Sequence, residues 1–339
     1  GAFGFDQGYD EFVYLGHGTA SWVSEVVRKR LAGEMPDTPV FMFVHTLEPH
    51  EPYTPREGSS RVFDRGFEGR YDGSPASMER IDVLRPDLSE ADVEHLVDLY
   101  DAEIRDADQG FAEFVAAIKS AGRYEDSVVV LLSDHGEAFA EHDTFGHGWD
   151  LNRETMRVPL VIKFPGGQHA GTRVTERVSL VDIVPTVLGE ADLEVDLSYE
   201  LPGRDLSRAM ADPASGSSRR VYAEVSRWDS NDLDLVAVID EDGYKRVIDV
   251  SVPPRENATE RSIGLWDTRA DPMEERDLSS KLPVRARYGE QLIAEWLVEQ
   301  KGHGKGSTAG TQPKVQVDED MRRQLHDLGY LKGRASPGD

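Results

Sequence analysis

Residues 127–148 read SVVVLLSDHGEAFAEHDTFGHG, an apolar run followed directly by closely spaced acidic residues and histidines. A short continuous apolar run is typical of a strand that is buried on both faces of a sheet. Two similar runs, VFMFVH at 40–45 and VPLVIK at 158–163, lie on either side of it in the sequence. We therefore expect three strands of one buried sheet.

Two helices are expected to alternate with these strands. Apolar residues recur at three- and four-residue steps over 93–118, after Ser89 as a candidate N-cap and before Gly122 as a candidate stop. A shorter amphipathic pattern covers 22–31. This alternation predicts an α/β layered sandwich with a largely parallel central sheet.

The second half of the chain follows a different pattern. Short strand-like runs at 221–225 and on both sides of Asp242-Gly243 predict a small antiparallel sheet, because Asp-Gly is a hairpin turn signal. A helix is expected at 285–300, and a short terminal helix at 321–331.

The chain is thus expected to have three parts. These are the later part of an α/β domain (1–195), a C-terminal α+β subdomain (196–300), and a linker with a terminal helix (301–339).

The composition is that of a globular chain. The 339 residues carry a formal net charge of −26 and are 38% hydrophobic. The acidic excess argues against nucleic acid or an anionic membrane as a partner, and no apolar run reaches the ~18 residues of a membrane span. The absence of cysteine excludes disulfides, thiolate metal ligands and a cysteine nucleophile within these residues.

Polar clusters follow two of the expected strands. Asp134-His135-Gly136 comes directly after the run at 128–133, and a segment containing His50 follows the run at 40–45. Ligands of open α/β sheets bind beyond the carboxyl ends of the strands. The sequence therefore predicts that both clusters open at one edge of the sheet.

Asp134 and His135 are the candidate metal ligands. A carboxylate oxygen beside an imidazole nitrogen can supply two ligands to a divalent cation. Gly136 would let the backbone bend closely at this turn. A strand-end turn that caps a helix would favour the same residues. This tripeptide alone is therefore equally consistent with a metal site and with a purely structural turn.

His50 and His147 are the candidate catalytic and substrate-binding residues. His147 lies between two glycines about a dozen residues after the candidate metal turn. An imidazole can bind a tetrahedral anion or protonate a leaving oxygen. A purely structural histidine is the alternative at both positions.

These segments together resemble the sulfatase family of the alkaline-phosphatase-like superfamily. FMFVHTLEPHEPYTP at 41–55 looks like the family's strand and "PHxPY" loop. The helix, the Asp-His-Gly turn and the "RVP" strand within 100–166 resemble the family's metal-binding region. Further matches continue in the family's order to QLHDLGYL at 324–331, so the resemblance covers most of the chain.

The resemblance implies roles for the candidate residues. Asp134 and His135 would bind one divalent cation, calcium before manganese or magnesium. Many relatives have asparagine at the second position, and histidine is the softer ligand. His50 would contact the sulfate group. His147 stands where many relatives have a lysine that binds sulfate and assists the leaving group, and an anionic neighbour would favour the protonated ring that this role requires.

Two family elements do not precede the matched segments. Relatives begin with a strand that ends in an Asp-Asp pair, followed by a Cys/Ser-x-Pro-x-Arg motif whose first residue becomes formylglycine. We therefore expect that the chain lacks the family's N-terminal part, that the formylglycine nucleophile lies outside it, and that the chain alone is nearly inactive.

Three functions are consistent with this pattern. The first is a sulfatase-like hydrolase that acts on a small-molecule or glycan sulfate ester. The second is a phosphoryl-transferring relative, such as a phosphodiesterase or phosphoethanolamine transferase, and the third is an inactive anion-binding α/β module. Relatives are often exported, which favours the periplasm or the cell exterior. The sequence does not indicate an oligomeric state.

Overall fold

The computed structural model describes residues 6–303 apart from 17, 64, 68, 84–85, 194–200, 212–218, 227–232 and 252–262. The described residues form two compact units, unit 1 with 6–82 and 86–125, and unit 2 with 83 and 126–303. The three-part division expected from the sequence stays a prediction.

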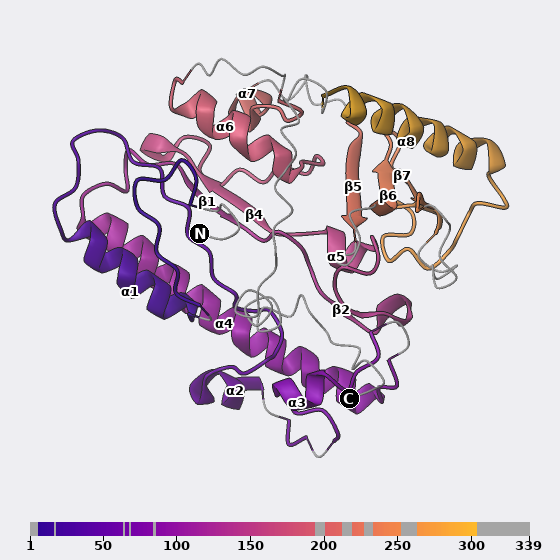
Figure 1. Ribbon diagram of the computed structural model, residues 1–339, viewed down its shortest axis with the longest axis horizontal. Coiled ribbons are helices and arrows are strands. Elements are labelled where there is room, and N and C mark those ends of the chain that lie inside the picture. Colours follow the sequence, from indigo (N-terminus) through magenta and orange to yellow (C-terminus); the bar gives the residue numbers. More distant parts are fainter. Residues whose placement is uncertain are drawn as a thin grey trace, which may run out of the picture. The chain divides into compact units, whose positions relative to one another are not determined.

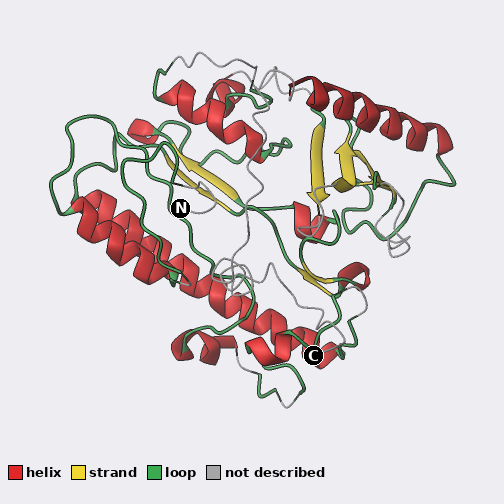
Figure 2. Ribbon diagram, in the orientation of Figure 1, coloured by secondary structure: helices red, strands yellow, loops and turns green. Residues whose placement is uncertain are grey.

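The described elements of unit 1 are all helices (Figure 2). They are α1 (Ala20–Leu31), α2 (Glu57–Phe63), α3 (Pro75–Met78) and α4 (Glu90–Ser120). Figure 1 shows α1 lying alongside the much longer α4.

The ends of α4 match the signals in the sequence. The Ser89 side chain accepts a hydrogen bond from the backbone N–H of Asp92, and the Asp92 carboxylate accepts one from the backbone N–H of Ser89. This reciprocal capping box satisfies two N–H groups that the helix leaves without partners. Gly122, just beyond the helix, has φ +69°. Both predicted helix boundaries are confirmed.

The two long helices of unit 1 approach each other at a glycine. A Cβ added at Gly110 of α4 would lie 2.5 Å from the Cβ of Ala20, the first residue of α1. The Ser24 hydroxyl of α1 donates a hydrogen bond of 2.7 Å to the carbonyl of Gly110. The absence of a side chain at Gly110 therefore lets the helices pack closely enough for this bond.

The strand expected at 40–45 is absent, and that prediction is wrong for the described structure. The segment has no regular secondary structure. Its apolar side chains are exposed, reaching 65% at Phe41 and 68% at Phe43. A strand requires a neighbour for its ladder of hydrogen bonds, and the described part of unit 1 contains no strand.

Unit 2 contains the other two predicted strands. They are β1 (Val129–Leu132) and β4 (Leu160–Lys163), and they pair with Val130 opposite Ile162. The pairing is antiparallel, so the parallel order expected of the central sheet is not seen among the described strands. A second small pair follows β1 directly, β2 (Ala138–Phe139) with β3 (Phe145–Gly146).

The predicted small antiparallel sheet is present in unit 2. Its strands, in spatial order, are β5 (Val221–Ser226), β6 (Leu233–Ile239), β7 (Tyr244–Asp249) and β8 (Gly264–Asp267). The hairpin between β6 and β7 turns at Asp242-Gly243, where Gly243 has φ +89°. That turn prediction is confirmed, whereas the sequence pattern did not predict β8.

Alternate residues of β6 pack on opposite faces of this sheet. Val236 and Val238 pack against Leu292 and Ile293 of α8 (Pro283–His303), the helix drawn next to these strands in Figure 1. Leu235 and Ala237 face the other way, toward Leu151 and Trp266. The period of two along β6 thus gives the small sheet two buried faces.

The remaining described elements of unit 2 are short. They are η1 (Glu141–Asp143), α5 (Arg153–Met156), η2 (Pro165–Gly167), η3 (Leu180–Asp182), α6 (Ile183–Glu190) and α7 (Leu206–Ala211). The predicted terminal helix at 321–331 lies outside the described residues, as does the linker from 304 onward. Among the described helices, none has the length and apolar character to cross a membrane.

Candidate active site

The candidate metal ligands lie on a turn directly after β1. The Asp134 side chain is 68% exposed, and its Oδ1 lies 3.8 Å from Nε2 of His135. The same Oδ1 accepts a 3.0 Å hydrogen bond from the backbone N–H of His135. Both predicted ligand atoms therefore lie on one turn of unit 2.

The contacts of His135 suit a metal ligand. Its Nδ1 lies 2.9 Å from the carbonyl oxygen of Gly136, a contact that requires Nδ1 to carry the proton. In the neutral ring the lone pair is then on Nε2, the nitrogen nearer Asp134. An oxygen donor and an imidazole nitrogen are ligands that a divalent cation accepts. The donor set therefore fits the cation expected from the sequence.

Gly136 is required by a close approach to α5. Its N–H donates to the carbonyl of Thr155 at 2.9 Å. A Cβ at Gly136 would lie only 1.9 Å from the carbonyl oxygen of Glu154. The sequence suggested a glycine for a sharp bend, but Gly136 is not among the glycines with positive φ. Glycine is therefore required at position 136 because a side chain would collide with the backbone of Glu154.

Gly136→Ala is expected to destabilise unit 2 by about 3 kcal/mol, because the added methyl group collides with a backbone atom that cannot rotate away. Urea unfolding would measure the loss. Gly58→Ala is the matched control, since Gly58 lies in α2 with open space around its Cβ position, and alanine there should leave stability unchanged or raise it. Equal stability of Gly136→Ala and Gly58→Ala would contradict this role of Gly136.

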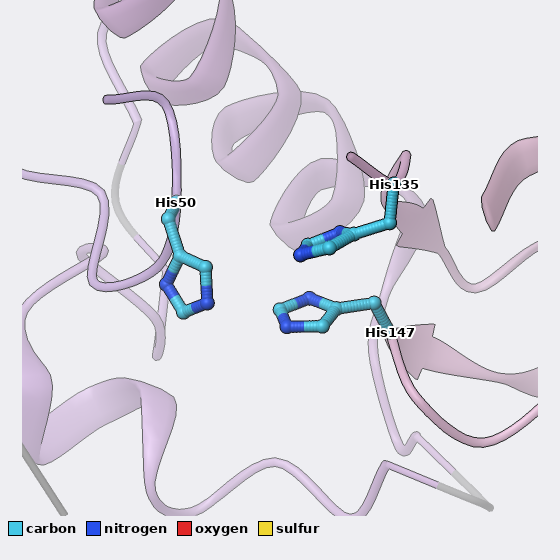
Figure 3. A group of neighbouring side chains, drawn as sticks. All are labelled: His50, His135 and His147. Atoms are coloured by element: carbon cyan, nitrogen blue, oxygen red, sulfur yellow. The ribbon is translucent and has the colours of Figure 1, made fainter. Parts of the chain in front are cut away.

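His147 lies at the base of the β2–β3 hairpin, next to the metal turn. Its ring stacks on that of His135, as Figure 3 shows. The two ring centroids are 4.0 Å apart. Its Nδ1 donates a 2.9 Å hydrogen bond to Oε1 of Glu137, whose side chain is only 4% exposed. Asp134, His135 and His147 are therefore brought together within unit 2.

Glu137 also lies in the candidate site, although the sequence pattern did not single it out. It directly precedes β2, and His147 directly follows β3. Because Ala138 pairs with Gly146, residues 137 and 147 are the next cross-strand pair. A hairpin assigned to 138–146 would have predicted this pair. The Glu137 carboxylate is an anionic neighbour of the kind expected for His147, since it orients the ring and stabilises positive charge on it.

His50, also labelled in Figure 3, belongs to unit 1. Its Nδ1 lies 2.6 Å from the carbonyl oxygen of Glu51. Tyr53, in the same loop, is buried and packs edge-on against Tyr100 of α4, with ring centroids 5.7 Å apart. The structure thus attaches the His50 loop to α4, whereas the convergence of His50 with Asp134 and its neighbours stays a prediction.

A buried acid on α4 holds the end of the His50 loop. The backbone N–H of Thr54 donates a 2.6 Å hydrogen bond to Oε1 of Glu103, a residue that is only 4% exposed. Burial raises the pKa of Glu103 to about 8, and the nearby acids Glu48 and Asp106 add to the rise. Glu103 is therefore a neutral acid at pH 7.

Glu103→Gln is expected to make the protein more stable than the wild type by about 1–3 kcal/mol at pH 9. The unfolded chain releases this proton near pH 4.5, but the folded chain releases it only near pH 8. The wild type should therefore lose stability as pH rises from about 4.5 to about 8 and lose no more above that, whereas the neutral amide should not lose any. Urea unfolding at pH 6 and pH 9 measures the difference.

Glu113→Gln on the exposed side of α4 is the matched control, and it should follow the wild type at both pH values. If Glu103→Gln lost as much stability as the wild type between pH 6 and pH 9, a neutral Glu103 would be excluded.

Comparison with solved structures shows that the chain has the alkaline-phosphatase-like α/β fold. Phosphonate monoester hydrolase of Agrobacterium radiobacter matches with a TM-score of 0.63 at 21% identity, over 81% of this chain and 60% of that one. A second protein, solved in complex with its substrate D-glucosamine-2-N,6-O-disulfate, matches with a TM-score of 0.59 at 15% identity, over 88% and 72%. The predicted fold class is thereby confirmed.

Sequence comparison identifies the family within this fold. The sulfatase family profile matches residues 21–193, just over half of the chain, and the chain belongs to the sulfatase family. The ulvan-active sulfatase of Formosa agariphila is 29% identical over 191 residues. That match covers 54% of this chain and 34% of the relative, so the chain spans about a third of the relative's length.

Proposed function

We propose that the natural protein, meaning the protein that carries this chain, hydrolyses a small-molecule or glycan sulfate ester with the help of a divalent cation. The observation that carries the proposal is the contact between the metal turn and His147. A carboxylate, an imidazole and a second imidazole paired with a buried acid lie together in a chain of the sulfatase family.

Asp134 and His135 would hold the cation. The exposed carboxylate of Asp134 and the Nε2 lone pair of His135 would be its ligands. Calcium is proposed before manganese or magnesium because the resemblance to the family implies it, although the histidine ligand also suits a softer ion. When bound, such a cation withdraws charge from the group that is being transferred. His135 is held in the required orientation by its Nδ1 contact with the Gly136 carbonyl.

His147 and His50 would act on the substrate. His147 would bind the sulfate oxygens and donate a proton to the departing alcohol oxygen, with Glu137 orienting its ring. His50 would contact the sulfate group and is the second candidate for the same proton transfer. The nucleophile is expected to be a formylglycine from outside these 339 residues.

Metal dependence tests this proposal. Treating the natural protein with a chelator should reduce sulfate release from an aryl sulfate to background, and adding Ca²⁺ should restore it. Manganese and magnesium salts show how selective the site is. Sulfate release that is unchanged after chelation would contradict the proposed function.

A phosphoryl-transferring hydrolase is the second candidate. The similarity to a phosphonate monoester hydrolase favours it, because that structure matches this fold about as well as the sulfated-sugar complex does. The Asp-His metal turn is compatible with either chemistry. This candidate predicts that the natural protein releases phosphate or phosphonate faster than sulfate. The third candidate, an anion-binding module, predicts binding of sulfate without release from any ester.

A further inference from the structure

A buried chain of contacts links the small sheet of unit 2 to the hairpin that carries His147. Nζ of Lys245 on β7 lies 2.6 Å from Oε2 of Glu274, with side chains 1% and 4% exposed. The Glu274 carbonyl accepts a 3.2 Å hydrogen bond from Nε2 of His142 in η1. Nδ1 of His142 forms a 3.2 Å ion pair with Oε2 of Glu154 in α5. We call these four residues the buried network.

Charges within the buried network balance one another. The adjacent carboxylate of Glu154 raises the pKa of His142 to about 9. Burial lowers the pKa of Lys245, and attraction to Glu274 opposes that shift. Asp150, also buried, adds a further negative charge near Lys245. A doubly protonated His142 ring suits both contacts, because an oxygen atom lies 3.2 Å from each of its nitrogens.

The hairpin has few means of holding its own shape. Strands β2 and β3 are two residues long, too short to be stable alone. The connecting tip contains three non-glycine residues with positive φ, Ala140 at 71°, His142 at 52° and Asp143 at 58°. Such conformations persist only where the surroundings hold them. The network residue His142 is itself one of the three, so the network holds the tip where the backbone is strained.

The base of the hairpin carries His147. Glu137 and His147 extend the pairing of Ala138 with Gly146, and the His147 ring lies against His135. A displacement of the tip would therefore tilt the base and move His147 relative to the metal turn.

We propose that the buried network is a positioning element for His147, which fixes the hairpin tip so that the base holds this ring against the metal turn. Glu154 joins both parts, since its carboxylate pairs with His142 while its carbonyl lies against Gly136. The inference rests on the proposed catalytic role of His147. The four residues of the buried network act through His147 and do not touch the substrate.

His142→Asn in the natural protein tests the proposal. Asparagine tolerates the positive φ but is too short to reach both partners of the histidine. We expect kcat for an alkyl sulfate to fall roughly ten- to a hundredfold, the effect of a misplaced catalytic group. In ¹⁵N-histidine-labelled protein without substrate, we also expect the His147 ring signals to shift and broaden.

His169→Asn is the matched control. His169 also has positive φ, 55°, and lies in the same unit outside the buried network. It should leave kcat and the His147 signals unchanged. If His142→Asn folds poorly, the double variant Lys245→Met, Glu274→Gln removes both buried charges together and leaves neither unpaired. It should shift the same ring signals.

The ring signals separate this inference from the proposed function. If the natural protein cleaves no sulfate ester, the proposed function fails, while a shift of the His147 signals in His142→Asn still supports the positioning role. Unchanged His147 signals in folded His142→Asn would overturn the inference, whatever the enzyme activity.

Discussion

Asp134→Asn is expected to lower kcat/KM for sulfate-ester hydrolysis roughly a hundredfold in the natural protein. The substitution keeps an oxygen atom at the position but removes the negative charge that attracts a divalent cation. The exposed Asp134 carboxylate lies 3.8 Å from Nε2 of His135, so the substitution changes one of the two proposed ligand atoms on this turn. Steady-state kinetics over a calcium titration would measure both the loss and a higher calcium requirement.

Asp192→Asn is the control for this change. Asp192 is exposed, lies in unit 2 just beyond α6, and has φ 51°, which asparagine also adopts. It should leave both kcat/KM and the calcium requirement unchanged. Turnover of Asp134→Asn equal to that of Asp192→Asn would remove Asp134 from the metal site.

His147→Ala is expected to reduce the hydrolysis of esters with poor leaving groups most strongly. For an alkyl sulfate the loss should be roughly 10²- to 10⁴-fold, the range of general acid catalysis. An activated aryl sulfate needs no proton on its leaving oxygen, so its kcat should fall much less. The comparison is between kcat values for the two esters in the same preparation.

His169→Ala serves as the control because His169 lies outside the His135–His147 pair and packs edge-on against Phe164. Both esters should be cleaved normally by that variant. An equal loss for the two esters in His147→Ala would show that His147 acts on the sulfate group and does not assist the leaving group.

The local signals of the sequence were sufficient for the boundaries of the long helix α4. The boundaries of α4 follow from Ser89 and Gly122, which act on backbone groups within one turn of themselves. For the run at 40–45 the local pattern was not sufficient, because a strand depends on a partner that is distant in the chain. Its composition fits a strand, yet the described part of unit 1 supplies no partner.

The candidate site was predicted where its residues are close in sequence. Asp134, His135 and His147 lie on one turn and one short hairpin, and the structure brings their side chains together. The contact between Lys245 and Glu274 joins residues that are 29 positions apart, and no local pattern specifies it. The sequence contains only a weak indication that Lys245 is buried. It is two residues before Val247 in β7, so both side chains lie on the same, buried face of the strand.

Glu103 shows, within a helix, that burial can be predicted from the sequence but a distant contact partner cannot. It lies seven residues after Leu96 and seven before Gly110, so all three share the buried face of α4. An acid at such a position could have been recognised from the sequence as a buried one. Its partner, the backbone N–H of Thr54, could not, because that contact depends on how the loop folds back on the helix.

The ratio of kcat/KM for a matched aryl sulfate and aryl phosphate, measured with the natural protein in calcium, tests the central claim most directly. The two esters share one leaving group, so the ratio reports only which tetrahedral centre the site prefers. We expect the sulfate to be the better substrate, with the preference lost together with activity in Asp134→Asn. A clear preference for the phosphate would contradict the sulfatase assignment and support the phosphoryl-transferring alternative.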